Sequence, residues 1–434
     1  MSAIRYIRFV VRLAAVAAAG AALLGVLPWP AAPRWVPSAS PFVAVCSAIA
    51  GGAFQIAWAA ALAVAAACLI RPRWFCRWAC PMGLLVETAS TPRRVLLRRC
   101  RAKAPPAARP ATAAAPPRVR IGPLVFWATL GGAIAGYPLL LWLDPLVLLS
   151  ASAGPHSGLT SAAAVALAGV GAILLLALFG GPIWCTRLCP LGAMQDVLSG
   201  PRRWIRAARS TPSAVRSAPV RASDDSVNKL PDGGTTNAAR RTVLSGAAAL
   251  LGTGLGALAG LRLRGRSQAG APLRPPGAVG EDCFTGVCIR CGACVRACPA
   301  HILRSDLAPA SPAGWLAPRV EFASDYCRED CTRCMDVCPS GALRAVPLPR
   351  KQEAKIGLAR VDLTLCWLAT GRECHSCIHA CPYQAIQSVW DEDVYSSKPV
   401  VKPELCNGCG ACQPVCPSAP QAIRVKPARQ KEVQ

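Results

Sequence analysis

Histidine is scarce in this 434-residue sequence: only His156, His301, His375 and His379 occur, and no apolar stretch contains a pair of them. A Cys-x-x-Cys-His motif is also absent. The sequence therefore gives no support for membrane haem b held on paired histidines or for covalently attached haem c. Acidic residues are few, 22 against 48 lysines and arginines, so the net charge is +26. Such a basic excess can indicate nucleic-acid binding, but its distribution points to a different origin.

Apolar residues make up 53% of the sequence, and the mean hydropathy is +0.35. Four stretches are rich in Ala, Leu, Val and Gly and nearly free of charge: 8–28, 43–70, 121–149 and 159–184. Each is long enough to cross the hydrocarbon core of a bilayer, which needs about 20 helical residues. The sequence thus predicts an α-helical membrane domain with four spans.

Basic residues alternate between rich and poor loops along this domain. The N-terminal tail contains Arg5, Arg8 and Arg12, and residues 71–120 contain twelve basic residues. In contrast, residues 29–42 contain only Arg34, and residues 150–158 contain none. Because basic loops stay in the cytoplasm, the pattern places the N-terminus and loop 71–120 on the cytoplasmic side of a bacterial inner membrane. Much of the net charge is therefore a topology signal, and we predict no nucleic-acid partner.

A fifth apolar segment, 240–266, follows a cytoplasmic linker over residues 201–239 that is rich in Pro, Ala and Ser. The segment begins with Arg240-Arg241 and is rich in glycine and alanine. It resembles a twin-arginine export signal in mid-chain; an ordinary fifth span or a surface helix is the alternative. The twin-arginine route exports folded cargo, which suits metal centres that are assembled inside the cell. This interpretation places the chain beyond residue 262 in the periplasm.

Sixteen cysteines repeat one spacing four times in the last third of the chain. The first and fourth motifs read Cys-x2-Cys-x2-Cys-x3-Cys-Pro, and the second and third have a longer first gap. This run is typical of bacterial 4Fe–4S ferredoxins, so we predict an α+β ferredoxin-like domain over 280–434 with four clusters. Zinc sites and a disulfide scaffold are the alternatives. The predicted ligands are Cys288, Cys291, Cys294, Cys298; Cys327, Cys331, Cys334, Cys338; Cys366, Cys374, Cys377, Cys381; and Cys406, Cys409, Cys412, Cys416.

The fourth cysteine of such a motif can serve a neighbouring cluster, so four motifs should form two exchanging pairs. We expect the first motif to pair with the fourth and the second with the third, because their spacings then match. Cys283 precedes the first motif by five residues and is predicted to be a free thiol. Cys100, next to a Pro-rich stretch, is also predicted to be free.

Residues 1–200 contain an internal duplication, in which two apolar stretches followed by Cys-x3-Cys-Pro occur twice. Both motifs should lie at the cytoplasmic face. Four thiolates are what one 4Fe–4S cluster needs. We therefore predict a further cluster on Cys76, Cys80, Cys185 and Cys189. A zinc site, a redox dithiol or four idle cysteines are the alternatives.

Ionisable residues within spans are functional candidates by default. Asp144 lies near the outer end of the third stretch and could accept a proton from a quinol; the alternative is a carboxylate that reaches to the outer interface. Tyr137 and Gln55 are weaker candidates.

Together these motifs resemble two protein families. Residues 1–200, with the duplicated Cys-x3-Cys-Pro motif, resemble the NapH-type membrane ferredoxin of periplasmic nitrate reductase systems. The segment 240–266 and the four cysteine motifs resemble the periplasmic NapG-type ferredoxin and its methylamine-utilisation relative, MauM. The chain thus looks like a fusion of the two.

The resemblance implies a quinol dehydrogenase component that relays electrons from the quinone pool to a periplasmic cytochrome, reductase or dehydrogenase. The alternative is a maturation factor for a periplasmic redox enzyme. NapH-type proteins usually carry further cysteine motifs after the second Cys-x3-Cys-Pro, whereas residues 196–239 contain no cysteine. Nothing in the sequence resembles a molybdenum–pterin site. The predicted topology also leaves about 30 Å of hydrocarbon between the inner cluster and the outer ones.

Overall fold

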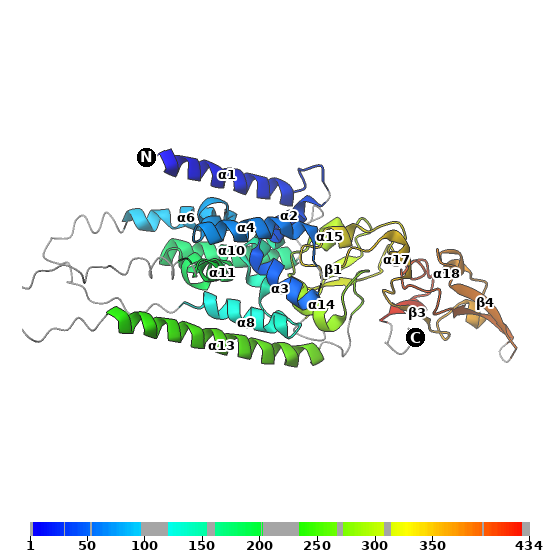
Figure 1. The fold of residues 1–434 in the computed structure, drawn as a ribbon. Coiled ribbons are helices and arrows are strands. Elements are labelled where there is room, and N and C mark those ends of the chain that lie inside the picture. The colour runs from blue at the N-terminus through cyan, green and yellow to red at the C-terminus, as the bar shows by residue number, and fades with distance from the viewer. Residues whose placement is uncertain are drawn as a thin grey trace, which may run out of the picture.

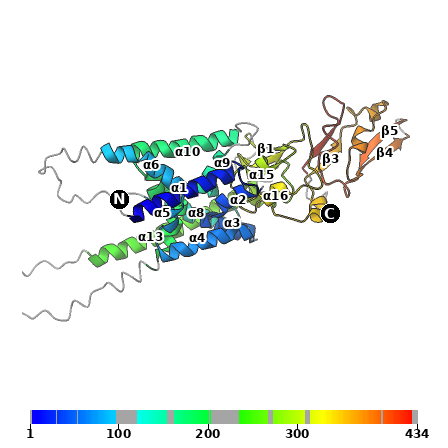
Figure 2. The same cartoon turned by 90° about the horizontal axis from the view of Figure 1, so that it is seen from above.

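The computed structural model describes residues 3–29, 31–52, 54–96, 120–153, 161–200, 202, 234–266, 272–307, 314–392 and 395–427. These residues form two regions that lie end to end: a bundle of roughly parallel helices and a cysteine-rich region with short strands (Figure 1). The second view shows the same arrangement, with the C-terminal strands farthest from the bundle (Figure 2). Cys100 and nearly all of the predicted linker 201–239 lie outside the described residues.

The helical region contains two similar series of helices. The first series runs α1 (Ala3–Leu23), α2 (Ala32–Ser38), α3 (Pro41–Gly51), η1 (Ile56–Trp58), α4 (Ala59–Ile70), α5 (Trp74–Trp78) and α6 (Pro81–Ala89). The second series runs α8 (Gly122–Ile134), η3 (Leu141–Leu143), α9 (Pro145–Ser152), α10 (Ser161–Gly180), the π-helical turn η4 (Trp184–Leu188) and α11 (Pro190–Leu198). A long helix, α13 (Gly234–Arg266), follows and begins before the predicted segment 240–266.

Three of the described helices are long and apolar enough to cross a membrane: Ala3–Leu23, Ala163–Gly180 and Ser245–Arg264. The predicted spans 43–70 and 121–149 are each broken into shorter helices. Gly52 ends α3 with a φ of +63°, and Gly136 follows α8 with a φ of +82°. Both glycines take the left-handed conformation that other residues disfavour, so each apolar stretch bends back instead of continuing as one helix.

A buried hydrogen bond joins the two series of helices. Ser40 caps the N-terminus of α3, and Asp144 caps the N-terminus of α9 by accepting from the Leu146 amide at 2.9 Å. The Ser40 hydroxyl donates to Asp144 Oδ2 at 2.7 Å. Asp144 is fully buried. Its carboxylate therefore joins the two series of helices. The alternative interpretation, in which this carboxylate reaches to the outer interface, does not agree with its burial.

Helix α13 packs along α8 through glycines, and the two helices run side by side (Figure 1). Gly252, Gly256 and Gly260 recur every fourth residue and are buried on the side that faces α8. A Cβ added at Gly256 would lie 1.9 Å from the Ala128 carbonyl oxygen, and one at Gly131 would lie 2.0 Å from that of Thr253. Only glycine permits this backbone contact, which is the usual way for membrane helices to associate closely.

The cysteine-rich region consists of short helices and three two-stranded antiparallel sheets. Its helices are α14 (Glu281–Val287), α15 (Ala293–Ala297), α16 (Arg333–Asp336), α17 (Leu348–Glu353), η6 (Leu368–Thr370) and α18 (Ser376–His379). The sheets pair β1 (Leu303–Ser305) with β2 (Pro318–Val320), β3 (Leu358–Val361) with β6 (Ile423–Lys426), and β4 (Ile386–Asp391) with β5 (Ser396–Val401).

Two pairings close this region into consecutive units. Ala278 bridges Leu343, so the chain before the first cysteine motif meets the chain after the second. In the same way, β3 precedes the third motif and pairs with β6, which follows the fourth, with Leu358 opposite Lys426. Each unit therefore encloses two motifs that are neighbours in the sequence.

The first unit is seated on the end of the helical region. The Trp58 indole donates to the Pro339 carbonyl at 2.9 Å, and the Tyr137 hydroxyl donates to Thr285 Oγ1 at 3.0 Å. Ile289 and Cys291 belong to the same apolar core as helices of the helical region. Tyr137, a candidate for quinol chemistry on the sequence, thus contributes to the contact between the two regions.

Candidate metal centres

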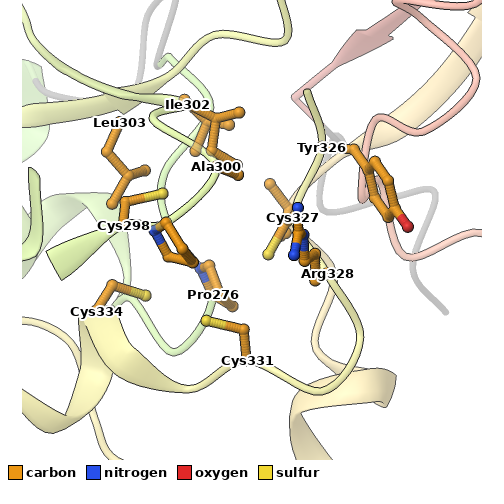
Figure 3. A pocket seen from close by; sticks show the side chains of 13 residues that line it. Pro276, Cys298, Ala300, Ile302, Leu303, Tyr326, Cys327, Arg328, Cys331 and Cys334 are labelled. Atoms are coloured by element: carbon orange, nitrogen blue, oxygen red, sulfur yellow. The ribbon is translucent and has the colours of Figure 1, made fainter. Parts of the chain in front are cut away.

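Four cavities in the cysteine-rich region are each lined by four cysteines. In one of them, the sulfur atoms of Cys298, Cys327, Cys331 and Cys334 turn towards a common space (Figure 3). The other three cavities are lined by Cys288, Cys291, Cys294 and Cys338; by Cys366, Cys374, Cys377 and Cys416; and by Cys381, Cys406, Cys409 and Cys412. All sixteen cysteines singled out in the sequence are accounted for. We name the resulting sites first to fourth after the motif that provides three of the cysteines.

The fourth cysteine of each motif lines the cavity of its neighbour. Cys338 completes the first site and Cys298 the second, and likewise Cys416 completes the third and Cys381 the fourth. The expected pairing of the first motif with the fourth and of the second with the third is wrong. Matched spacing contains no information about proximity, whereas the strand pairings close the chain after every second motif.

The geometry suits clusters better than single ions. No group of three or more His, Cys, Asp or Glu side chains in the described part of the chain converges closely enough to hold one metal ion. A structural zinc would need such convergence, with four ligands at 2.0–2.3 Å from one centre. Four cysteines around a cavity instead leave room for a cubane between the sulfur atoms.

Backbone amides point at several of these sulfur atoms. The Leu343 amide donates to Cys338 Sγ at 3.4 Å, and the Ala385 amide donates to Cys381 Sγ at 3.3 Å. Such bonds favour thiolates and help to set the reduction potential of a cluster.

Burial of the thiols also disfavours their charged thiolate form unless a cation lies nearby. Burial raises the pKa of Cys291 and of Cys409 to about 12, and that of Cys377 to about 11. Neighbouring cysteines contribute to each of these increases, because adjacent thiolates repel one another. A metal centre in each cavity would provide the positive charge that stabilises such thiolates. The cysteines present fit four 4Fe–4S clusters on both geometric and electrostatic grounds.

A fifth group of cysteines gathers at the other end of the helical region, as the duplication predicted. Cys76, Cys80, Cys185 and Cys189 line one cavity of about 350 Å³. Cys80 and Cys189 are the N-caps of α6 and α11, and their sulfur atoms accept from the amides of Gly83 and Gly192 at 3.4 and 3.3 Å. Each helix N-terminus therefore presents its positive dipole end to one sulfur atom.

Polar residues from both series of helices surround these cysteines. Gln195 Nε2 donates to Cys76 Sγ at 3.2 Å across the two halves. Arg73 forms a two-bond contact with Asp196 at 2.8 and 2.6 Å, and Arg12, which is 6% exposed, pairs with Glu87. Their motif spacing alone did not indicate these partners.

A signal for the two acidic residues was present in the sequence. Glu87 and Asp196 each stand seven residues after the second cysteine of their motif. Aligning the duplicated halves would have found them.

Cys283 lines none of the five cysteine cavities and remains a predicted free thiol. Gln55 lies beside the first site: in the amide orientation that satisfies both groups, it donates to the Cys338 carbonyl at 3.2 Å and accepts from the Gly341 amide at 3.1 Å. Gln55, like Tyr137, thus belongs to the contact between the two regions.

Comparisons with known proteins agree with this arrangement. A family described as "4Fe-4S binding domain" matches residues 53–100 and 162–212, which include the two Cys-x3-Cys-Pro motifs. A "4Fe-4S dicluster domain" family matches residues 287–342 and 372–419, so each match includes cysteines of two neighbouring motifs. No solved structure matches the chain.

Three curated relatives are ferredoxin-type proteins. The ferredoxin-type protein NapG of Escherichia coli K12 is 35% identical over 184 residues, which is 40% of this chain and 78% of the relative. MauM, the methylamine utilization ferredoxin-type protein, is 34% identical over 178 residues in Methylobacillus flagellatus, covering 38% of this chain and 73% of the relative. In Methylorubrum extorquens, MauM is 35% identical over 187 residues, covering 40% of this chain and 83% of the relative.

Cysteine quartets with exchanged fourth ligands, matched by 4Fe–4S domain families, define an iron–sulfur electron-transfer protein of the ferredoxin type. The identity to NapG and MauM, over more than two thirds of each relative, assigns the chain to one family within this class. The chain belongs to the family of the ferredoxin-type proteins NapG and MauM.

Proposed function

We propose that this protein is a membrane-bound relay that takes electrons from quinol and delivers them to a periplasmic redox protein. The observation that carries the proposal is the presence of cysteine quartets at both ends of one helical bundle. Bound clusters would supply one-electron transfer at each site. The chain itself would hold them on the sixteen C-terminal cysteines and on Cys76, Cys80, Cys185 and Cys189.

The seating of the first site connects the outer quartets with the helix that leads towards the inner one. Trp58 contacts Pro339, next to the first-site cysteine Cys338, and helix α4 then leads from Ala59 to Ile70, shortly before Cys76. Twelve helical residues rise by about 18 Å, so α4 spans about 18 Å of the path from Pro339 to Cys76.

The membrane topology in this proposal follows the basic loops, with the N-terminus in the cytoplasm and the ferredoxin domains in the periplasm. Three apolar helices support membrane insertion. The glycine contact between α13 and α8 supports a retained anchor in place of a cleaved signal, because the helix is already committed to a partner in the bundle. In this proposal residues 1–200 correspond to the NapH-like half of a fusion.

Glu87 is the carboxylate best placed to accept a proton from quinol. It lines the cavity of the inner cysteines and pairs there with Arg12. Asp144, the candidate from the sequence, is instead engaged in capping α9 and in bonding Ser40. Oxidation of one quinol releases two electrons and two protons, and two one-electron protein acceptors in the periplasm would balance it.

The direct test is EPR of the anaerobically purified full chain during addition of a reduced quinol analogue. The proposal predicts reduced-cluster signals that grow with quinol and disappear in Cys76→Ser. The matched control is Cys46→Ser, which removes a buried cysteine of α3 that lines no quartet cavity. Signals that dithionite elicits but quinol does not would overturn the quinol step and leave the ferredoxin assignment intact.

A further inference from the structure

The four C-terminal sites differ in charge at one equivalent position. The residue two places after the third cysteine of each motif is Arg296 in the first motif, Asp336 in the second, His379 in the third and Pro414 in the fourth. Only the first motif has an obligate cation there. A fixed positive charge within the loop that wraps a cluster acts on that cluster at short range.

Arg296 bonds both the first-site loop and the helical region. Its Nη1 donates to the Cys291 carbonyl at 3.2 Å, to the Ala153 carbonyl at 2.6 Å and to the Ser150 carbonyl at 3.3 Å. Ser150 lies in the last turn of α9, and Ala153 is its C-cap, where a cation is favoured by the helix dipole. One guanidinium group thus ties the first site to the end of α9.

Part of this guanidinium group has no partner in the protein. Arg296 Nε and Nη2 are buried and lack a hydrogen-bond acceptor among the described residues. Burying charged donors without an acceptor is costly. A cluster held by four thiolates carries net negative charge, and it would provide the missing counter-charge beside Cys291.

The loop of the first motif contains a second arginine, Arg290, and so a second positive charge. Arg290 has a φ of +59°, where the fourth motif has Gly408 with a φ of +76°. Its guanidinium group donates to the carbonyls of Trp315 at 2.8 Å and Cys288 at 3.2 Å. The left-handed region disfavours residues other than glycine, so the first loop keeps a cation at a position better suited to glycine.

We propose that Arg296 is a positioning residue that seats the first site against the helical region and raises the reduction potential of that site. A nearby positive charge in a poorly solvated loop stabilises the reduced form of a cluster, which has one more negative charge than the oxidised form. The inference rests on the proposed function in one respect only, which is that this site receives the electrons from the helical region. The potential itself is measured without quinol.

The test is a dye-mediated redox titration of the full chain, followed by EPR, with iron content measured in parallel. Arg296→Gln should shift the potential of the first site downwards and leave the other three unchanged. Arg296→Lys should restore most of the wild-type potential, because it restores the charge. Cys288→Ser assigns this signal to the first site. The matched control is Arg304→Gln, which removes an exposed arginine from β1 in the same unit and should move none of the potentials.

Three results would overturn the inference: an unchanged first-site potential in Arg296→Gln, a shift at another site instead, or an equal fall in Arg296→Lys. If Arg296→Gln fails to retain iron, the remaining variants decide. Arg290→Gln must then lower the same potential while Arg296→Lys keeps it, and any other outcome rejects the proposal. Failure of the quinol step would leave all of these potentials in place, so the two proposals fail separately.

Discussion

The contact between α13 and α8 allows one substitution to be compared at two positions of the same helix. At Gly256 an added methyl group would lie 1.9 Å from the Ala128 carbonyl oxygen, so the helices must separate by about 1.1 Å to reach a tolerable 3.0 Å. At Gly254, two residues away, nothing lies within 4 Å of the same methyl group. Gly256→Ala and Gly254→Ala therefore make the same chemical change in opposite surroundings.

The expected free-energy changes differ in sign between the two substitutions. Replacing glycine by alanine within a helix gains up to about 1 kcal/mol in helix propensity at either position. Overpacking at a close contact costs about 1–3 kcal/mol. Gly254→Ala should therefore be neutral or stabilising, and Gly256→Ala should be destabilised relative to it by about 1–3 kcal/mol, since the propensity gain cancels in the comparison.

The assay is thermal unfolding of the purified full chain in detergent, followed by tryptophan fluorescence. Trp127 on α8 reports on the contact directly, because its Cβ lies 3.1 Å from the position that a Cβ at Gly252 would occupy. At about 2–4 °C per kcal/mol, Gly256→Ala should melt several degrees below Gly254→Ala. Equal melting temperatures, or a less stable Gly254→Ala, would refute the packing of α13 on α8 and with it the argument for a retained anchor.

Two further predictions concern the exchanged ligands and the buried cap. Cys338→Ser should remove the same EPR signal as Cys288→Ser and spare the one lost in Cys331→Ser, because Cys338 lines the first cavity; loss of the Cys331 signal would contradict the exchange. Asp144→Ala should destabilise the helical region by about 1–3 kcal/mol in thermal unfolding, since it removes a helix cap and strands the Ser40 hydroxyl, whereas Asp144→Asn, which can still cap α9, should retain most of the stability. An Asp144→Ala variant as stable as the wild type would show that the carboxylate has no structural role.

The sequence was sufficient where spacing itself determines the chemistry. Cysteines three residues apart must lie around one loop, and all sixteen predicted ligands line cavities. The duplicated Cys-x3-Cys-Pro motif likewise brought Cys76, Cys80, Cys185 and Cys189 together, because two equivalent halves of a bundle place equivalent helix ends side by side.

Long-range pairing was beyond the reach of the sequence. The partner of the first motif depends on the meeting of Ala278 with Leu343, and similar spacing did not indicate it. Hydropathy alone could not distinguish a continuous span from a stretch that bends at Gly52 or Gly136. The role of Arg296 depends on the end of α9, some 140 residues earlier in the chain.

The central claim is that one polypeptide holds iron–sulfur clusters at both ends of its helical bundle. It is tested most directly by the iron and acid-labile sulfide content of the full chain purified without oxygen. The account predicts about twenty irons per chain, four for each of five clusters, and about sixteen in Cys76→Ser. About sixteen in both proteins would leave the C-terminal ferredoxin domains in place and contradict the inner cluster, and with it the relay.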